Sequence, residues 1–359
     1  MNGRHFDVAI VGGGAAGSAA ALTLLRQGCR VAIIESSDFV QPRVGETIPP
    51  DANLLLDELN VTSAFRAQRH LPCYGSASLW GSGQLGHNDF VVNVHSHGWH
   101  LNRARFDAML LDQAKGNGAT VLHEKCHAVQ TRQDRVCAIT TVLGELTATD
   151  YIDATGRNGL LVKTLGIAKK FDDRQVVVWA RFQLGDTLGF GNSTWLESAP
   201  YGWWYGARLP RGEAIVALGT DPHVAKSMNI YDLKSWLFQL TDTQLMAPRL
   251  DGAQLIADSF RITSSHSYCI SRAAGENWLA TGDAASAFDP LSSAGIYKAL
   301  LTGQLAAETI INGQRLAYQA RIKSDYRTYL DMRAHLYKGE QRWPDHAFWK
   351  TRQRALVAA

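Results

Sequence analysis

The chain has 359 residues, of which 46% are hydrophobic and 19% charged, and its formal net charge is +3. This composition excludes a disordered or fibrous protein, and the length predicts two lobes rather than one. No apolar run approaches the roughly 20 residues that a membrane-spanning helix needs. The five cysteines are odd in number and include no Cys-x-x-Cys pair, so we expect a cytoplasmic protein without a disulfide framework or a metal site.

A dinucleotide-binding motif occupies the first part of the chain. Residues 7–11 predict a strand, the glycines of GGGAAG (12–17) a turn, and residues 18–27 a helix whose N-terminus can stabilise a pyrophosphate. A second predicted strand at 30–34 ends at Glu35, where an acidic side chain can bind a ribose diol. The expected binding residues are Gly12, Gly14, Ala15, Ala16, Gly17, Glu35 and Ser36.

The next segment, RVGETIPP (43–50), contains paired prolines and predicts a rigid, extended turn. Two interpretations are open from these residues. The segment is either a connector that begins the next helix or a loop held against a cofactor.

Period-two alternation over residues 71–100 and 166–264 predicts an antiparallel sheet that covers the cofactor. Within it, GSGQLG (81–86) also fits the G-x-G-x-x-G pattern. An alternating segment follows it instead of a helix, so we predict a hairpin turn there.

Histidines gather in HSHGWH (95–100), which as a strand places His95 and His97 on one face and His100 on the other. No cysteine or carboxylate accompanies them, so a metal site is not expected. His97 and His100 are either structural residues or proton-handling groups near the cofactor.

The segment YGWWYGARLP (201–210) lies in the same predicted sheet. Its aromatic residues are either half-buried strand residues or the walls of a pocket for an aromatic substrate. The candidate pocket residues are Trp203, Trp204 and Tyr205.

Two distant segments complete a series of motifs. YIDATGRNG (151–159) predicts a strand that ends at Ala154-Thr155-Gly156, and residues 277–303 predict a strand, Gly282-Asp283, a loop and a helix. Together with the glycines, Glu35 and Arg103-x-x-Phe106-Asp107, this order resembles the motif series of FAD-dependent monooxygenases of the glutathione-reductase type.

The resemblance implies an α/β fold class with an α+β second lobe. A glutathione-reductase-type Rossmann FAD-binding domain over residues 1–70, 101–165 and 265–320 is expected beside an antiparallel-sheet substrate domain over 71–100 and 166–264. Residues 321–359 are expected to form a helical basic tail.

The same resemblance implies further contacts to FAD. Asp283 is expected to bind the ribityl hydroxyls, and the backbone amides after Pro290 are expected to face the pyrimidine ring, where a helix N-terminus favours negative charge. The residues concerned are Arg43, Arg103, Thr155, Gly156, Gly282, Asp283, Pro290, Ser293, Ala294 and Gly295.

Two segments, GETIPP (45–50) and FDPLSSAG (288–295), are similar to flavin-edge segments of flavin-dependent tryptophan halogenases. The similarity implies that the 43–50 loop lies beside the flavin, with Glu46 and Asp289 as candidate catalytic groups. For Glu46, a role in fixing the loop stays open. That family places a lysine before its Arg-x-x-Phe-Asp segment and carries a Trp-x-Trp-x-Ile-Pro signature. This chain has no lysine before Lys115 and lacks the signature, so halogenation is not expected.

The remaining resemblance is to LodB-type and GoxB-type flavoproteins, which mature tryptophylquinone-dependent amino-acid oxidases by oxidising a tryptophan of a partner protein. It is carried by GETIPP, YGWWYGARLP, GWHLNRARFD (98–107) and FDPLSSAGIY (288–297). It implies an FAD-dependent monooxygenase that uses molecular oxygen to hydroxylate an indole in the precursor of such an oxidase. The reductant is either transiently bound NAD(P)H or a separate flavin reductase. The rival interpretations are a hydroxylase or halogenase of a free small aromatic and a non-catalytic flavin-binding chaperone.

The C-terminal tail is basic, with ten Lys or Arg against four Asp or Glu from Arg315 to the end. It also carries Trp343, Phe348 and Trp349. The tail is interpreted either as a solvated amphipathic helix or as a docking surface for an acidic or macromolecular partner. No recognition motif for nucleic acid accompanies the charge, so a nucleic-acid partner is not expected.

Overall fold

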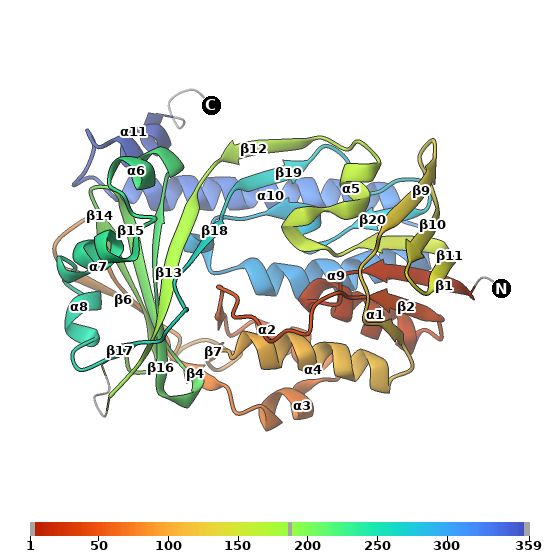
Figure 1. The fold of residues 1–359 in the computed structure, drawn as a ribbon, viewed down its shortest axis with the longest axis horizontal. Coiled ribbons are helices and arrows are strands. Elements are labelled where there is room, and N and C mark those ends of the chain that lie inside the picture. Colours follow the sequence, from red (N-terminus) through yellow and green to blue (C-terminus); the bar gives the residue numbers. More distant parts are fainter. Residues whose placement is uncertain (1–3, 186–188, 355–359) are drawn as a thin grey trace.

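The computed structural model describes residues 4–185 and 189–354, which form two packed halves (Figure 1). The first half contains a seven-stranded sheet of order β8-β2-β1-β11-β10-β9, with β20 beside β11. β8, β2, β1, β11 and β20 pair in parallel, while β10 and β9 add an antiparallel hairpin. The strands are β1 (Arg4–Val11), β2 (Val31–Ile34), β8 (Thr120–Leu122), β9 (Ala128–Arg132), β10 (Arg135–Thr141), β11 (Gly144–Asp153) and β20 (Trp278–Ala280).

Helices α1 (Ala15–Arg26) and α9 (Gly295–Asn312) pack closely together in this half. Small residues make the approach possible, because a Cβ at Gly303 of α9 would collide with the carbonyl oxygen of Ala16. The other helices of this half are α2 (Ala52–Glu58), α3 (Thr62–Ala67), α4 (Arg103–Gly116) and α5 (Leu160–Thr164).

The second half contains an eight-stranded sheet of order β17-β13-β16-β15-β14-β5-β6, with β18 beside β13. The pairs are antiparallel except β14 with β5, which is parallel. The turn between β5 and β6 confirms the hairpin predicted at 81–86. The strands are β5 (Gly75–Leu79), β6 (Leu85–Asp89), β13 (Val176–Gln183), β14 (Ser193–Ala199), β15 (Gly202–Leu209), β16 (Glu213–Thr220), β17 (Gln254–Leu255) and β18 (Arg261–Ser264).

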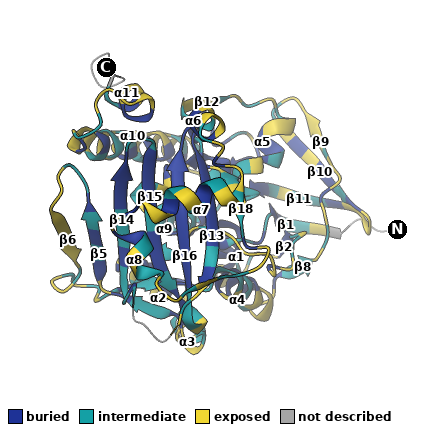
Figure 2. Ribbon diagram, turned by 60° about the vertical axis from the view of Figure 1, so that its left-hand side comes forward, coloured by how far each residue is buried: buried dark blue, intermediate teal, exposed yellow. Residues whose placement is uncertain are grey.

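Three helices lie on the outer face of this sheet, where only strands were predicted from the alternating pattern (Figure 2). Trp236 of α7 and Met246 of α8 pack on the outward-facing Trp204, so the sheet is buried on that side as well. The helices are α6 (Pro222–Ser227), α7 (Leu233–Thr241) and α8 (Met246–Arg249).

Two small sheets join the halves, of order β3-β7-β4 and β12-β19-β21. Strand β7 covers only Gly98–His100, and residues 90–97 form turns and irregular backbone. The prediction that His95 and His97 share one strand face is therefore wrong. The remaining strands are β3 (Thr47–Ile48), β4 (Leu71–Cys73), β12 (Lys169–Asp173), β19 (Ser267–Ile270) and β21 (Ser286–Ala287).

The C-terminal part consists of α10 (Arg315–Gly339), which runs along most of the molecule's length, and α11 (Ala347–Arg354) at its end (Figure 1). The domain boundary expected at 320/321 falls inside α10. The aromatic residues of the tail are packed rather than solvated, because Phe348 and Trp349 are fully buried against Trp203 and Tyr337.

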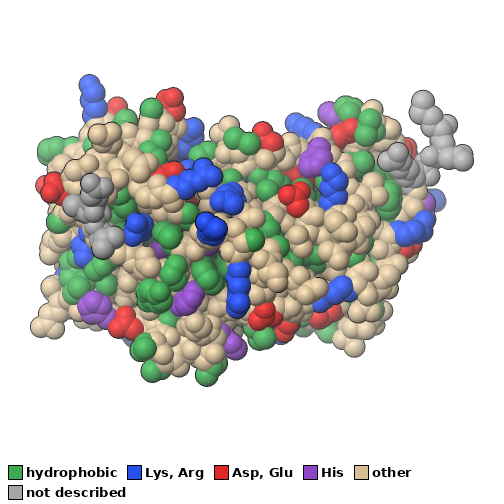
Figure 3. Space-filling model, turned by 90° about the horizontal axis from the view of Figure 1, so that it is seen from below, with side chains coloured by type: hydrophobic (Ala, Val, Ile, Leu, Met, Phe, Trp, Pro, Cys, Tyr) green, Lys and Arg blue, Asp and Glu red, His purple; other side chains and the backbone are tan. Residues whose placement is uncertain are grey.

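Seen from below, Lys and Arg side chains gather near the middle of one face, between the two halves (Figure 3). Within the described residues, the helices are all too short or too polar to cross a lipid bilayer.

The buried carboxylate of Glu340 generates a prediction about pH-dependent stability. Its oxygens accept hydrogen bonds from Gly81 N (2.8 Å) and Arg342 Nη2 (2.7 Å), and from the hydroxyl of Ser198. Burial raises the pKa of Glu340, but these donors outweigh burial and lower it from 4.5 to about 2. Its contribution to stability is therefore complete above pH 4.5 and is lost as the pH falls toward 2.

We expect Glu340→Gln to lower the free energy of unfolding by about 1–3 kcal/mol at neutral pH, measured by urea unfolding. The difference from the wild type should shrink as the pH falls below 4.5. Glu276→Gln, which removes an exposed ion pair to Arg135, is the control and should cost less than about 1 kcal/mol. Equal stability of Glu340→Gln and wild type at neutral pH would contradict the prediction.

Candidate functional site

A cavity of about 640 Å³ lies between the two halves. One end is formed by the carboxyl ends of β1, β2 and β11, at Val11, Ile34 and Ala154. The other end is formed by the inner face of the large sheet, at Trp203 and Tyr205 of β15. Crevices at the carboxyl ends of parallel strands are the usual ligand sites of such sheets.

The glycine motif shapes the first end of the cavity. Gly12 has φ +101°, and a Cβ there would collide with the carbonyl oxygen of Ala154. A Cβ at Gly17 would in turn collide with the carbonyl oxygen of Gly12. A Cβ at Gly14 would meet no atom within 4 Å, and Gly14 and Ala15 line the cavity, so the N-terminus of α1 faces it.

Glu35 closes this turn with both carboxylate oxygens. It accepts hydrogen bonds from Gly13 N (2.6 Å) and Ser37 N (2.7 Å), and it lines the cavity with Ser36. The carboxylate therefore fixes the loop and still presents acceptor capacity to a ligand.

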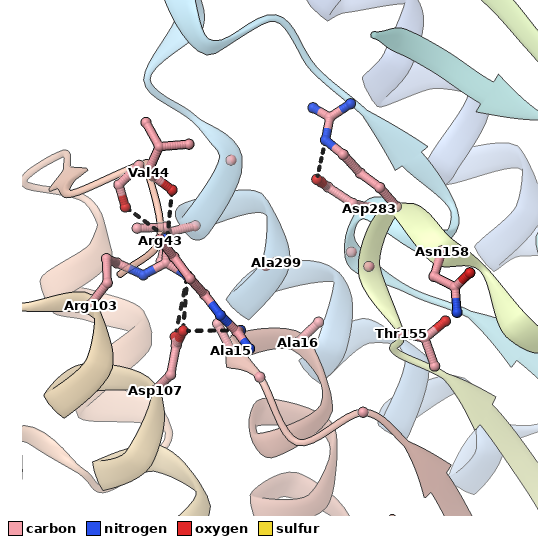
Figure 4. Close-up of a pocket in the computed structure, with 18 of the residues that line it drawn as sticks. Ala15, Ala16, Arg43, Val44, Arg103, Asp107, Thr155, Asn158, Asp283 and Ala299 are labelled. Carbon is pink, nitrogen blue, oxygen red and sulfur yellow. Dashed lines mark hydrogen bonds and ion pairs between the residues drawn. The ribbon is translucent and has the colours of Figure 1, made fainter. Parts of the chain in front are cut away.

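Two arginines lie opposite the start of α1 (Figure 4). Arg103 Nη1 donates to the carbonyl oxygen of Gly45 at 2.7 Å, and Arg103 Nη2 donates to Asp107 at 3.1 Å. Arg43 Nη1 lies 3.6 Å from the same Asp107 carboxylate. Arg103 thus holds the 43–46 loop in place, and both guanidinium groups line the cavity.

Glu46 is 4% exposed and lines the cavity. Its carboxylate accepts a hydrogen bond from Gly45 N at 2.9 Å, and its backbone carbonyl accepts one from Leu101 N at 2.7 Å. Burial raises the pKa of Glu46 to about 7, although Arg103 opposes the shift. The adjacent Thr47 shares a hydrogen bond of 2.8 Å with the Tyr205 hydroxyl.

The Asp283 carboxylate forms ion pairs with two cationic side chains that were not predicted from the sequence. Lys298 Nζ lies 2.7 Å from Asp283 Oδ1, and Arg157 Nε lies 3.4 Å from Asp283 Oδ2. Burial raises the pKa of Asp283, but the two cations outweigh burial and the net shift is downward. An ionised carboxylate is therefore held at the cavity wall.

The segment 288–295 forms part of the cavity wall. Asp289 caps the short turn after it by accepting from Leu291 N at 3.0 Å. Ser293 has φ 49°, an uncommon conformation for a residue with a side chain, and it leads directly into α9. Its strained backbone places the first turn of α9 against the cavity.

At the second end, strand alternation decides which aromatic residues reach the cavity. Trp203 and Tyr205 point inward with Val177 and Ala217 of neighbouring strands. Trp204 points to the opposite face and packs beneath α7, so its expected place in the substrate pocket is wrong.

The structure brings most of the expected residues together but leaves several outside. The described residues that line the cavity include neither His97 nor His100. His100 is buried elsewhere against Thr194 at 3.3 Å, and burial lowers its pKa to about 4. Gly17 and Ala294 are also not among the described residues of the lining: Gly17 packs against the Gly12 backbone, and Ala294 directly precedes α9.

Sequence reasoning missed Lys298 and Arg157, and it also missed Asp153. Asp153 Oδ1 accepts from Thr155 N (3.0 Å) and Thr155 Oγ1 (2.6 Å). Its other oxygen accepts from Val162 N at 3.1 Å, so this carboxylate ties the end of β11 to α5. Asp153 could have been identified from its place directly before Ala154-Thr155-Gly156. No sequence motif, in contrast, indicates that Lys298 pairs with Asp283.

The cavity lining fits FAD at both ends of the cofactor. The uncapped start of α1 and two guanidinium groups suit a pyrophosphate, and Glu35 suits a ribose. The ionised Asp283 suits a polyol chain, and the start of α9 suits an electron-rich ring edge. No group of His, Cys, Asp and Glu suited to a metal ion occurs within the described residues.

Comparisons with known proteins agree with this chemistry. A sequence model of the family described as FAD dependent oxidoreductase matches residues 7–338. LodB, an FAD-dependent oxidoreductase of Marinomonas mediterranea, is 33% identical over 361 residues, which cover 97% of each chain.

Solved structures share the fold. The flavin-dependent halogenase CmlS superimposes with a TM-score of 0.83 at 29% identity, over 98% of this chain and 68% of that chain. The peptidyl tryptophan dihydroxylase QhpG, described as essential for tryptophylquinone cofactor biogenesis, superimposes with a TM-score of 0.76 at 23% identity. That match covers 97% of this chain and 79% of QhpG and concerns the fold alone. Because the family model spans nearly the whole chain, this protein belongs to the FAD dependent oxidoreductase family and is a flavin-dependent oxidoreductase with FAD as its cofactor.

Proposed function

We propose that this protein hydroxylates the indole ring of a tryptophan in a partner polypeptide, the precursor of a tryptophylquinone-dependent amino-acid oxidase. One observation carries the proposal: the end of the cavity away from the glycine motif combines two aromatic walls, Trp203 and Tyr205, with two buried carboxylates, Glu46 and Asp289. Aromatic walls suit a flat, electron-rich substrate, and a buried carboxylate can accept the ring proton. The identity with LodB over nearly the whole chain supports the same assignment.

The distribution of lysine argues against halogenation. Within the described part of the chain, Lys125 is the one lysine that lines the cavity. It follows β8, whose Leu122 pairs with Ile34 of β2, so it lies at the glycine-motif end near Glu35. The aromatic end therefore lacks an amine to direct an oxidised halide.

The cofactor and the protein divide the reaction between them. Bound and reduced FAD supplies the activation of molecular oxygen. One oxygen atom enters the indole ring, the other leaves as water, and the reductant, NAD(P)H or a separate reductase, supplies two electrons. In this assignment Arg43 and the start of α1 bind the pyrophosphate, and Asp283 binds the ribityl chain. The ring proton passes to the carboxylate of Glu46, which is half ionised near pH 7.

The first prediction from the proposed function concerns cofactor binding. Asp283→Ala removes the acceptor for the ribityl hydroxyls and should raise the dissociation constant for FAD by about 10- to 100-fold, measured by fluorescence titration of the apoprotein. Asp325→Ala, which removes an exposed partner of Arg321 on α10, is the matched control and should bind FAD like the wild type. Thermal unfolding of both apo variants separates lost binding from lost folding. Unchanged affinity in Asp283→Ala would remove this residue from the cofactor site.

The second prediction concerns pH. Because burial raises the pKa of Glu46 to about 7, the base form accumulates as the pH rises through 7, and the rate of hydroxylation should rise with it. Glu46→Gln should lose this limb of the pH profile and lower kcat by about 100-fold, measured with saturating precursor. A variant that keeps the limb would leave Glu46 as an anchor of the loop only.

The third prediction tests the substrate. The reduced holoprotein, mixed with isotopically labelled oxygen gas and an unmodified oxidase precursor, should add labelled oxygen to one or more tryptophans, read by mass spectrometry of peptides. A precursor with the modified tryptophan changed to phenylalanine is the control. Oxygen on free indoles but none on the precursor would replace the polypeptide substrate with a small aromatic. Halogen incorporation in the presence of bromide would overturn the reaction type. Precursor binding without any incorporation would indicate a chaperone.

A further inference from the structure

A buried polar cluster connects the C-terminal helices to the wall of the cavity. Its centre is Asp289, which lines the cavity and is 1% exposed. Asp289 Oδ2 accepts from the Tyr337 hydroxyl at 2.7 Å and from Gln175 Nε2 at 2.8 Å, and Arg333 Nε lies 3.4 Å away. Tyr337 and Arg333 belong to α10, nearly fifty positions further along the chain.

Helix α10 also holds the backbone of the same segment. Asp289 N donates to the Tyr329 hydroxyl at 2.8 Å, and Phe288 stacks on the Tyr329 ring with centroids 4.1 Å apart and planes 4° from parallel. Phe288, Asp289 and Pro290 all line the cavity. One face of α10 thus fixes both the side chain and the backbone of this wall.

Tyr337 joins two walls of the cavity. Its hydroxyl donates to Asp289 on one side and accepts from Trp203 Nε1 at 3.1 Å on the other. Gln175 Nε2, 2.8 Å away, supplies a further donor, so the donor and both acceptor positions of the hydroxyl have partners. Trp203 lies on β15 of the large sheet and Asp289 lies in the segment before α9, and Tyr337 is the bridge between them.

Helix α11 braces the cluster from outside. Arg352, nearly fully buried, pairs with Asp173 at 3.0 Å and with Asp221 at 2.7 Å. Asp173 also pairs with Arg333, which in turn lies beside Asp289, so the charges form one continuous network. Among the described side chains of the tail, five basic groups pair with acids, which reduces the charge that the tail offers to a partner; they are Arg315, Arg321, Arg333, Arg342 and Arg352.

We infer that Tyr337 is a positioning residue of the active site, and that its hydroxyl sets the placement of Asp289 relative to Trp203. The C-terminal helices are then a working part of the site rather than a docking appendage. The expected effect on oxygen transfer rests on the proposed function, whereas the effect on the bound cofactor does not. Asp289 lines the cavity and lies in the segment that precedes α9, so its displacement should change the surroundings of the bound flavin.

The experiment compares Tyr337→Phe with Tyr326→Phe in the full-length holoprotein. Both tyrosines lie on α10 and are buried, and both variants keep the ring and lose only the hydroxyl. The Tyr326 hydroxyl donates to Asp172 at 2.8 Å. Neither Tyr326 nor Tyr337 is among the described residues of the cavity lining. The first readout is the visible absorption spectrum of bound FAD. The second is the coupling ratio, the oxygen atoms transferred to the precursor per two electrons supplied, with the remainder measured as hydrogen peroxide.

Tyr337→Phe should shift the flavin bands and lower the coupling ratio by about tenfold, whereas Tyr326→Phe should match the wild type in both. Trp203→Phe removes the indole donor and keeps an aromatic wall. In the double variant, the changes in the flavin spectrum and the coupling ratio should be smaller than the sum of the two single effects, because both substitutions break the same hydrogen bond.

Identical spectra of the Tyr337→Phe and Tyr326→Phe holoproteins, with additive effects in the double variant, would overturn the inference. If no protein in the series oxygenates any precursor, the proposed function fails, and the spectral comparison still decides the role of Tyr337. If Tyr337→Phe does not retain FAD, the spectrum of Trp203→Phe takes its place, with an unshifted spectrum counting against the inference.

Discussion

The whole cavity depends on the close contact of three backbone segments at Gly12, Gly17 and Ala154. No Cβ can be accommodated at either glycine, because each would meet a carbonyl oxygen. The contact sets α1 directly behind the ends of β1 and β11, so that the helix N-terminus faces the cavity. A missing Cβ is needed in the same way at Gly303, which lets α9 approach α1. Cofactor binding and helix packing in this half thus follow from one steric constraint.

Asp107 and Asp283 at the cavity are paired with cations, whereas Glu46 is not. Asp107 has Arg103 on its own helix and Arg43 from an earlier loop, and Asp283 has Lys298 and Arg157. Glu46 has a backbone donor within hydrogen-bonding distance and Arg103 at longer range, so burial dominates and its pKa rises. A carboxylate that titrates near neutrality beside aromatic walls is the kind of group that can take up a proton during a reaction.

The fold is shared with a halogenase and with a peptidyl tryptophan dihydroxylase, so architecture does not separate these chemistries. In this chain Trp203 and Tyr205 line the aromatic end of the cavity, and the C-terminal helices pack behind its wall. Tyr337 and Tyr329 contact the wall that contains Asp289, and Trp349 and Phe348 seal the cluster from outside. These contacts give the tail a packing role that its basic composition did not suggest.

The sequence by itself determined the nucleotide-binding motif, the order of strands and helices around it, and a set of site residues most of which line the cavity. It could do so because tight turns and helix starts are local, and a local steric demand leaves a local signature. Tertiary structure alone decided that Trp203 faces the cavity while Trp204 faces α7, that residues 90–97 leave the strand pattern, and that three helices cover the outer sheet face. It also decided the partners of Asp283 and Asp289, since Lys298 and Tyr337 reach them only after the helices pack. Contacts between side chains of distant elements depend on how the elements pack in three dimensions, and such contacts produce no motif of fixed spacing in the sequence.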